Sequence, residues 1–221
     1  MNLMEAMNRR HSVRKYIDQP LASDALQALQ AEIAACNQEG DLHIQLVTNE
    51  PKAFDCFMAH YGKFSGVKNY IALIGKKSST LDEKCGYYGE RLVLKAQQLG
   101  LNTCWVAMSY QKVNNAFEIA AGEKLTVVIA LGYGETQGTA HTSKSAAAVS
   151  NLDPSSPAWF KAGVEAALLA PTAMNQQKFT LTYADGKVSA KAGLGFYAKL
   201  DLGIVKYHFE LGADAASFSW K

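Results

Sequence analysis

Apolar and polar positions along this 221-residue chain follow two periods, one helical and one strand-like. The helical period predicts helices at 2–10, from Ser23 onward, at 85–98, at 157–170 and at 201–213. Alternating or continuous apolar runs predict strands at 42–47, 70–75, 103–106, 125–131, 179–183, 187–191 and 218–220. The run 125–131 is almost entirely apolar, which is typical of a central strand covered on both faces. The mixture predicts an α+β protein.

Residues that favour turns and helix ends divide these elements. Ser23 is predicted to cap the second helix, and Gly100 to end the long helix at 85–98. Ser156 followed by Pro157 is a typical N-cap and first helical position. The pair Asp185-Gly186 between two strand-like runs predicts a hairpin turn.

Composition and charge exclude several classes of protein. Hydrophobic residues make up 48% of the chain and charged residues 19%, which indicates an ordinary globular protein. The net charge of +2 is too small for nucleic acid or an anionic membrane to be the main partner. We see no signal peptide and no membrane-spanning apolar run, so a cytoplasmic location is expected. The four cysteines form no C-x-x-C pair and match no zinc pattern, so we expect thiols and no metal.

The segment 135–158, rich in Gly, Ser, Thr and Ala, is the best linker candidate. The order helix, strand, strand, long helix, strand occurs on both sides of it, and residues 23–47 resemble residues 156–183 in pattern. We interpret this as a degenerate internal duplication with a shorter second copy. The predicted division is therefore 1–150 and 151–221, the two parts forming one compact unit.

A basic cluster near the N-terminus is the first candidate for chemistry. Arg10, Ser12 and Arg14 alternate, so an extended backbone points all three side chains the same way. Two guanidinium groups and a hydroxyl that converge on one point suit a phosphate monoester. The alternative is a solvated positive end of a short helix, where cations are favoured by the helix dipole.

A second candidate is the turn 170–179, which carries Thr172, Asn175 and Gln177 between a predicted helix and a predicted strand. Side-chain amides offer both donors and acceptors, as needed to bind a polar ring edge. The alternative is a capped turn in which these amides satisfy the local backbone.

Four segments together resemble nitroreductase-like flavoproteins. Arg10-His11-Ser12-Val13-Arg14 is similar to the family's Arg-x-Ser-x-Arg/Lys, and 170–177 to its Ala-Pro-Ser-x-x-Asn-x-Gln. Residues 99–105 and 130–134 are similar to the family's Leu-Gly-Leu-Gly-Thr-x-Trp and Ala-Leu-Gly-Tyr. The resemblance implies a nitroreductase-like α+β fold with a central, mostly antiparallel sheet flanked by helices, and bound FMN.

The resemblance also implies which residues hold FMN. The phosphate would be held by the basic cluster with help from the loop after residue 134: Arg10, His11, Ser12, Arg14, Ser143 and Lys144. The flavin ring would be lined by Thr172, Asn175 and Gln177. Backbone N–H groups near Ala107 and Met108 would face flavin N5, and Met108, Phe64 or Tyr88 would shape the pocket. For Lys144, a solvated linker lysine is the alternative.

The order of these motifs departs from the family pattern, because the Asn-x-Gln motif arrives only in the second half. Family members normally pair two identical subunits around FMN. A fused, degenerate pseudo-dimer with one FMN per chain explains the order, so we expect a pseudo-dimeric monomer, with a homodimer as the alternative.

The implied function is an FMN-dependent oxidoreductase. NADH or NADPH would reduce the flavin, and a small acceptor such as a nitroaromatic or quinone would then take its place, in a ping-pong cycle. One alternative is a protein that binds or sequesters flavin without turnover. Another is an anion-binding or interaction module without flavin.

Overall fold

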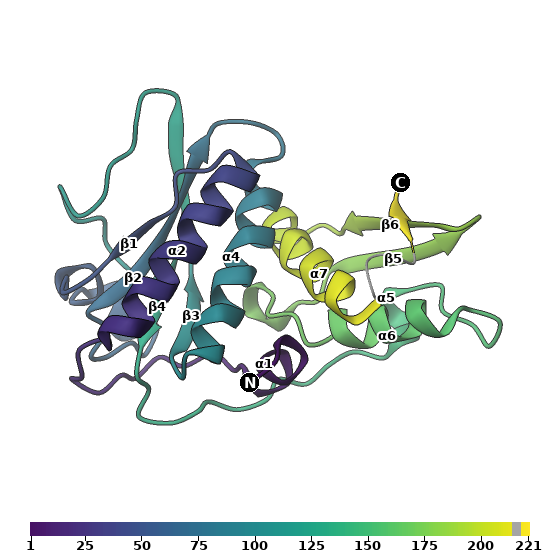
Figure 1. Cartoon of the computed structure of the whole chain (residues 1–221), viewed down its shortest axis with the longest axis horizontal. Helices are drawn as coiled ribbons and strands as arrows, with labels where there is room; N and C mark the ends of the chain where they lie inside the picture. Colours follow the sequence, from purple (N-terminus) through teal and green to yellow (C-terminus); the bar gives the residue numbers. More distant parts are fainter. Residues whose placement is uncertain (214–217) are drawn as a thin grey trace. The chain divides into compact units, whose positions relative to one another are not determined.

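The computed structural model describes residues 1–213 and 218–221 (Figure 1). The chain forms two compact units. Unit 1 comprises 1–8, 82–91 and 141–221, and unit 2 comprises 9–81 and 92–140. The two units are interleaved along the chain, whereas the division suggested by the sequence is contiguous.

Unit 2 contains a four-stranded, fully antiparallel sheet. Its strands, in spatial order, are β1 (Gln45–Val47), β2 (Asn69–Lys76), β4 (Glu123–Gly132) and β3 (Asn102–Val106). Residues 70–75 of β2 and 127–132 of β4 are buried, because both strands lie inside the sheet. The predicted central place of the apolar run 125–131 is therefore confirmed, as is the mostly antiparallel sheet.

Helices and an aromatic core complete unit 2. Its helical segments are α2 (Ser23–Gly40), η1 (Lys52–Phe54), α3 (Phe57–Tyr61) and the part of α4 (Leu81–Gln98) from residue 92 onward. The rings of Phe54 and Phe64 lie 5.3 Å apart, and Phe54 and Tyr70 lie 6.0 Å apart. Burying these rings removes much apolar area from water and anchors the segment 52–67 to the sheet.

Unit 1 is built on two packed helices and a small sheet. Helix α6 (Ala158–Ala167) packs along α7 (Ala198–Ala213). The hairpin β5 (Phe179–Ala184) and β6 (Lys187–Ala192) turns at Asp185-Gly186, whose φ values are 52° and 74°. Both values lie in the left-handed region, as the predicted turn requires. The remaining elements are α1 (Leu3–Arg9, to residue 8), α5 (Ala146–Val149), η2 (Ala173–Asn175) and β7 (Ser219–Trp220), which pairs parallel to β6.

Within unit 1, α4 and α7 approach as closely as backbones allow. A Cβ atom placed on Gly86 would overlap the carbonyl oxygen of Leu200, and one on Gly203 would overlap that of Glu83. Only glycine leaves room for the facing backbone at these two positions. This crossing fixes the first turns of α7, on which the site described below depends.

The two units repeat one order of elements. The order α2–β1–β2–α4–β3 recurs as α6–β5–β6–α7–β7. Strands β2 and β3 are both antiparallel to β4 and so run parallel to each other, while β6 and β7 pair directly in parallel. The second set therefore resembles the first without β4. The internal duplication stays a prediction that this order favours.

Several predicted element boundaries are wrong. Helix α2 begins at Ser23 itself, with Ala22 as N-cap and no side-chain cap bond. Helix α4 begins at Leu81 rather than at 85, and α7 at Ala198 rather than at 201. Strand β1 covers only 45–47, because the Asn37 side chain takes both backbone hydrogen-bonding groups of Ile44.

The start of α6 is also shifted, by one residue. Pro157 is the N-cap and the helix begins at Ala158. The Ser156 hydroxyl bonds to Asp153 Oδ1 at 3.2 Å instead of capping the helix, because Asp153 organises its own turn. Helix α5 (Ala146–Val149) lies inside the segment predicted as a linker.

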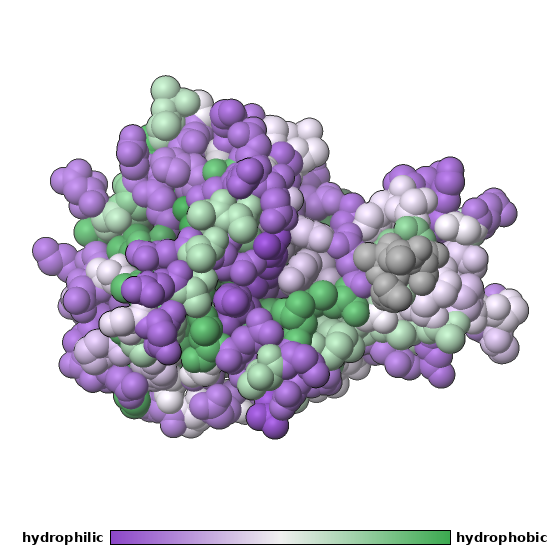
Figure 2. Space-filling model, viewed as in Figure 1, coloured by the Kyte–Doolittle hydropathy of each residue, from purple (hydrophilic) through white to green (hydrophobic). Residues whose placement is uncertain are grey.

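Most of the surface drawn in Figure 2 is hydrophilic, with smaller hydrophobic patches. Among residues 1–213 and 218–221, no helix is long and apolar enough to cross a membrane.

Candidate functional site

The segment from Arg10 to Tyr16 in unit 2 is extended and fixed along the start of β3. Ser12 forms a parallel bridge with Thr103, and Val13 N–H donates to Thr103 O at 3.0 Å. The buried Tyr16 hydroxyl donates to Val13 O at 2.7 Å. These bonds hold the backbone straight, so alternate side chains must leave it on opposite sides.

Ser12 forms a hydrogen bond with the thiol of Cys104 in β3, and the charges of Arg10 and Arg14 act on the same thiol. Burial raises the pKa of Cys104, while the charge of Arg14, a hydrogen bond with Ser12 and the charge of Arg10 oppose that rise. All three alternating side chains therefore act on the Cys104 thiol, and their convergence on a phosphate stays a prediction. Arg10 is only 4% exposed, whereas Arg14 is exposed, with its guanidinium 5.9 Å from the centre of the Phe64 ring.

His11 has different surroundings. A Cβ on Gly138 would lie 2.8 Å from His11 Cβ and 3.0 Å from Ser12 O, so the loop after β4 passes directly over this stretch. Gly138 has a φ of 74°, and glycine permits both this conformation and the close approach. His11 thus lies against the loop.

The second candidate segment, Thr172–Gln177 in unit 1, has an unusual backbone. Met174, Asn175 and Gln177 have φ values of 51°, 52° and 45°. Residues other than glycine adopt this left-handed conformation at a cost, and such residues are concentrated where a side chain must be aimed at a ligand. Met174 and Asn175 are both exposed.

Gln177 holds this loop from within. It is 3% exposed, and its amide donates to Thr142 O at 2.9 Å and to Asn175 Oδ1 at 2.8 Å. Its Oε1 accepts from Lys144 N–H at 2.8 Å. Gln177 therefore matches the alternative interpretation of this turn, in which the amides satisfy local backbone groups. In this conformation it supports the loop.

The other predicted residues of unit 1 belong to the same network. Asn175 Nδ2 donates to Thr142 O at 2.9 Å, and Thr172 Oγ1 accepts from Gln177 N–H at 3.0 Å. Lys144 Nζ donates to Gln176 O at 2.9 Å and Gln177 O at 3.0 Å, so its charge is placed on the loop carbonyls. Ser143 Oγ donates to Leu168 O at 3.1 Å.

The structure thus assembles the predicted residues into two groups. Arg10, Ser12 and Arg14 form a cluster in unit 2, and Ser143, Lys144, Thr172, Asn175 and Gln177 form a network in unit 1. In unit 2, Met108 lies in a bend after β3 with 66% of its surface exposed. Phe64 is a core residue of unit 2, and Tyr88 of α4 packs its ring 5.2 Å from that of Tyr87.

Asp201 was missed at the sequence level. It lies in the first turn of α7 with 4% exposure, and its carboxylate accepts hydrogen bonds from the Ala173 N–H and the Gln176 side chain. The available signal was an acidic residue inside the apolar run 200–205. Such a residue is rarely buried without a hydrogen-bonding task.

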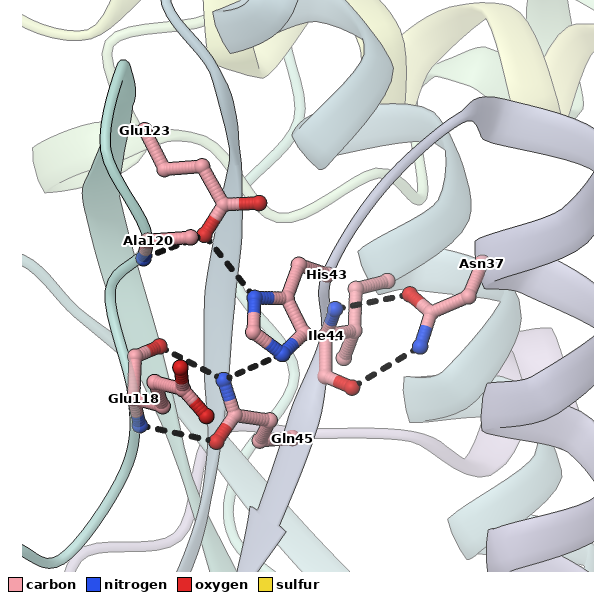
Figure 3. Close-up of polar contacts among 7 residues, drawn as sticks. All are labelled: Asn37, His43, Ile44, Gln45, Glu118, Ala120 and Glu123. Carbon is pink, nitrogen blue, oxygen red and sulfur yellow. Dashed lines mark hydrogen bonds and ion pairs between the residues drawn. The ribbon is translucent and has the colours of Figure 1, made fainter.

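A polar cluster elsewhere in unit 2 is structural (Figure 3). Glu118 fixes the Gln45 amide through its backbone N–H and carbonyl, so Gln45 Nε2 donates to His43 Nε2 at 3.1 Å. His43 then donates from Nδ1 to Glu123 at 2.8 Å, and this bond lowers the pKa of the Glu123 carboxyl. The cluster joins the strand β1 region to the start of β4.

A cleft of about 160 Å³ in unit 2 contains none of the predicted site residues. Its polar groups already bind each other: Lys68 pairs with Asp18 at 2.6 Å, and Asn69 accepts from Asn49 N–H. Among residues 1–213 and 218–221, no group of three or more His, Cys, Asp or Glu side chains could hold a metal ion. The four cysteines are free thiols.

The comparisons with known proteins define the class. The chain belongs to the family described as "Putative TM nitroreductase", whose model matches residues 2–213. A structure of a putative nitroreductase from Thermotoga maritima is 22% identical, covers 98% of this chain and 85% of its own, and has a TM-score of 0.67. No curated protein matches the chain.

Two further structures share the fold over a smaller part of the chain. A putative nitroreductase from Desulfovibrio desulfuricans, in complex with FMN, is 18% identical, covers 70% of this chain and 98% of its own, and has a TM-score of 0.53. A putative NADH dehydrogenase/NAD(P)H nitroreductase from Parabacteroides distasonis is 21% identical, covers 71% and 99%, and has a TM-score of 0.54. The predicted nitroreductase fold is confirmed.

The residues present fit the flavin mononucleotide that this family implies. Two guanidinium groups and a hydroxyl on one side of an extended segment match the charge and the acceptors of a phosphate. Asn175 uses one amide hydrogen on Thr142 O and accepts from Gln177 Nε2 at Oδ1, so one amide hydrogen of this exposed residue is left for a ligand.

Proposed function

We propose that this protein is an FMN-dependent oxidoreductase that takes electrons from NADH or NADPH and passes them to a nitroaromatic, a quinone or a related small acceptor. The observation that carries the proposal is that Arg10, Ser12 and Arg14 of the extended segment in unit 2 all act on the same thiol, that of Cys104. Membership of the nitroreductase family supports it, as do the FMN in the Desulfovibrio structure and the activity named for the Parabacteroides protein.

Each group of residues has a distinct task in this proposal. The guanidinium groups of Arg10 and Arg14 and the Ser12 hydroxyl bind the phosphate through charge-assisted hydrogen bonds. Asn175 has one amide hydrogen beyond its bonds with Thr142 and Gln177 and offers it to the polar edge of the ring. Gln177, Thr172 and Lys144 hold the loop that carries Asn175.

FMN, when bound, supplies the hydride and electron transfer chemistry. The protein has to orient the ring and leave one face open to the donor and acceptor in turn. Met174 and Asn175 are exposed, so the loop can border such a face without covering it. We propose one FMN per chain, in line with the single copy of each motif.

The test is the visible spectrum of the purified protein after FMN is added and the excess removed, followed by anaerobic NADH and NADPH. A retained flavin spectrum that bleaches supports the oxidoreductase and identifies the donor. A retained spectrum that does not bleach favours a flavin-binding protein without turnover. No retained flavin contradicts the proposal, and two FMN per chain contradict the single site.

Arg14→Ala is expected to weaken FMN binding about 10- to 150-fold, because it removes one charge-assisted bond worth roughly 1.5–3 kcal/mol. Lys15→Ala is the matched control: it removes the same charge from the neighbouring position, whose side chain leaves the extended segment on the other side. Fluorescence titration of FMN measures both. Equal losses in the two variants would exclude Arg14 from the phosphate site.

A further inference from the structure

The carboxylate of Asp201 in α7 holds Ala173 and Gln176 of the loop that carries Asn175. Asp201 Oδ1 and Oδ2 lie 3.0 and 3.1 Å from Ala173 N, and Oδ2 accepts from Gln176 Nε2 at 2.8 Å. Gln176 Nε2 also donates to Phe196 O at 2.6 Å. Asp201 is 4% exposed and therefore has lost most of its hydration.

The loop needs such a fastening because its backbone is costly. Met174, Asn175 and Gln177 lie in the left-handed region, and surrounding contacts must keep them there. One set of those contacts comes from Thr142 and Lys144. The other comes from Asp201 of α7, which lies next to the close approach of α4 and α7 at Leu200 and Gly203.

We propose that Asp201 is a positioning residue: its ionised carboxylate holds residues 173–176 in the conformation that presents Asn175 to the flavin, and protonation of Asp201 loosens the loop and weakens flavin binding. The flavin part rests on the proposed function, whereas the fastening of the loop does not. A protonated carboxyl keeps one acceptor oxygen and turns the other into a donor, so it can satisfy only part of the Ala173 and Gln176 donors.

The surroundings of Asp201 determine the pH range in which it gains its proton. Burial raises the pKa of Asp201 to about 6, against the opposing hydrogen bonds from Gln176 and Ala173. Lys199 lies two residues before Asp201 on α7, and Lys178 follows the loop. From α4, Glu83 faces this part of α7, but it pairs with Lys206 at 2.5 Å. Among residues 1–213 and 218–221, no charged side chain forms a salt bridge with Asp201.

The sign of the two pH effects is opposite. Between the ordinary carboxyl pKa of 3.8 and about 6, the folded chain holds a proton on Asp201 that the unfolded chain has released, so stability falls as pH rises through this window. When the loop loosens and Asp201 stays buried in α7, the carboxylate loses the Ala173 and Gln176 donors that favour its ionised form, so loop order and FMN affinity rise over the same window. If Asp201 served only the stability of the fold, stability and FMN affinity would change in the same direction with pH.

Asp201→Asn is the informative variant, because its amide imitates the protonated acid at every pH. Asp185→Asn is the matched control, since Asp185 is an exposed turn residue of the same unit with a left-handed backbone that asparagine accepts readily. The FMN phosphate itself titrates near pH 6, and both variants retain that contribution.

The experiment has two readouts on the full-length chain. In the absence of FMN, NMR signals of the Ala173 backbone amide and the Gln176 side-chain amide are followed from pH 4.5 to 8. Dissociation constants of FMN are measured over the same range. We expect the amide signals to titrate near pH 6 in the wild type and Asp185→Asn, and to stay flat in Asp201→Asn. We expect Asp201→Asn to bind FMN about tenfold more weakly at pH 7.5, equally at pH 5, and to melt at a higher temperature at pH 7.5.

A ratio of FMN affinities between wild type and Asp201→Asn that does not change with pH would overturn the positioning role. Amide signals that do not titrate would overturn the fastening itself. If neither protein binds FMN, the proposed function fails, and the amide titration without FMN still decides whether Asp201 holds the loop.

Discussion

His208→Phe is expected to destabilise the protein by about 3–5 kcal/mol, because it removes the histidine that bonds to a buried carboxyl. His208 and Glu90 are both fully buried, and His208 Nε2 lies 2.9 Å from Glu90 Oε1. The other ring nitrogen, Nδ1, lies 3.2 Å from Ala166 O. A carbonyl can only accept, so Nδ1 carries a proton and the pair shares a further proton between Nε2 and the carboxyl.

Urea denaturation of the wild type and variants measures this effect. Glu90→Gln keeps an acceptor for Nε2 and should cost much less, about 1 kcal/mol. The double variant Glu90→Leu/His208→Phe should recover part of the loss, since it removes the buried carboxyl together with the histidine. Additive losses in the double variant would show that the two residues are not energetically coupled.

Gly203→Ala is expected to cost about 3 kcal/mol or more, through forced separation of two helices. The added Cβ would overlap the carbonyl oxygen of Glu83 and lie 2.7 Å from the Tyr87 nitrogen. Both are backbone atoms of α4, which cannot move aside as the end of a side chain can. The ion pair Lys206–Glu83 and the bond from Tyr87 to Glu210 join the same two helices.

Gly100→Ala is the control for glycine conformation without a clash. Gly100 has a φ of 78° and no atom within 4 Å of an added Cβ, so only the left-handed backbone is penalised, by about 1 kcal/mol. Thermal and urea denaturation of the two variants compare the effects. Equal losses of stability in the two variants would mean that the close approach of α4 and α7 does not require glycine at position 203.

These two predictions concern the helix that also carries Asp201. The packing of α7 against α4 and α6 fixes where Asp201 meets the loop 173–176. Stability and site geometry therefore depend on the same contacts in unit 1, and only Asp201→Asn is expected to separate them.

Much of the secondary structure could be predicted, because periodicity and turn residues act locally. The central strand at 125–131 and the hairpin turn at Asp185-Gly186 follow from a run of apolar residues and from a pair that accepts positive φ. Helix starts were less accurate. A serine can cap a helix or bind a nearby turn at similar cost, and at Ser156 the turn of Asp153 prevails.

The candidate site was predictable to the extent that it is local. Arg10, Ser12 and Arg14 alternate, and once the segment is extended they must face one way. The left-handed loop was not predictable, because Met174 and Gln177 have no intrinsic preference for positive φ. That conformation is imposed by hydrogen bonds to the Thr142 carbonyl and the Asp201 carboxylate and by one from Lys144 N–H, all distant in sequence.

The sequence by itself determined the family resemblance, the order of helices and strands, and the composition of the Arg10, Ser12 and Arg14 cluster, since each depends on neighbouring residues. The tertiary structure alone decided that Gln177 and Lys144 spend their polar atoms on the loop, that Gly86 and Gly203 mark a helix crossing, and that Asp201 is buried against Ala173. These features join segments up to about 120 residues apart, and only the packed chain brings such groups within hydrogen-bond distance.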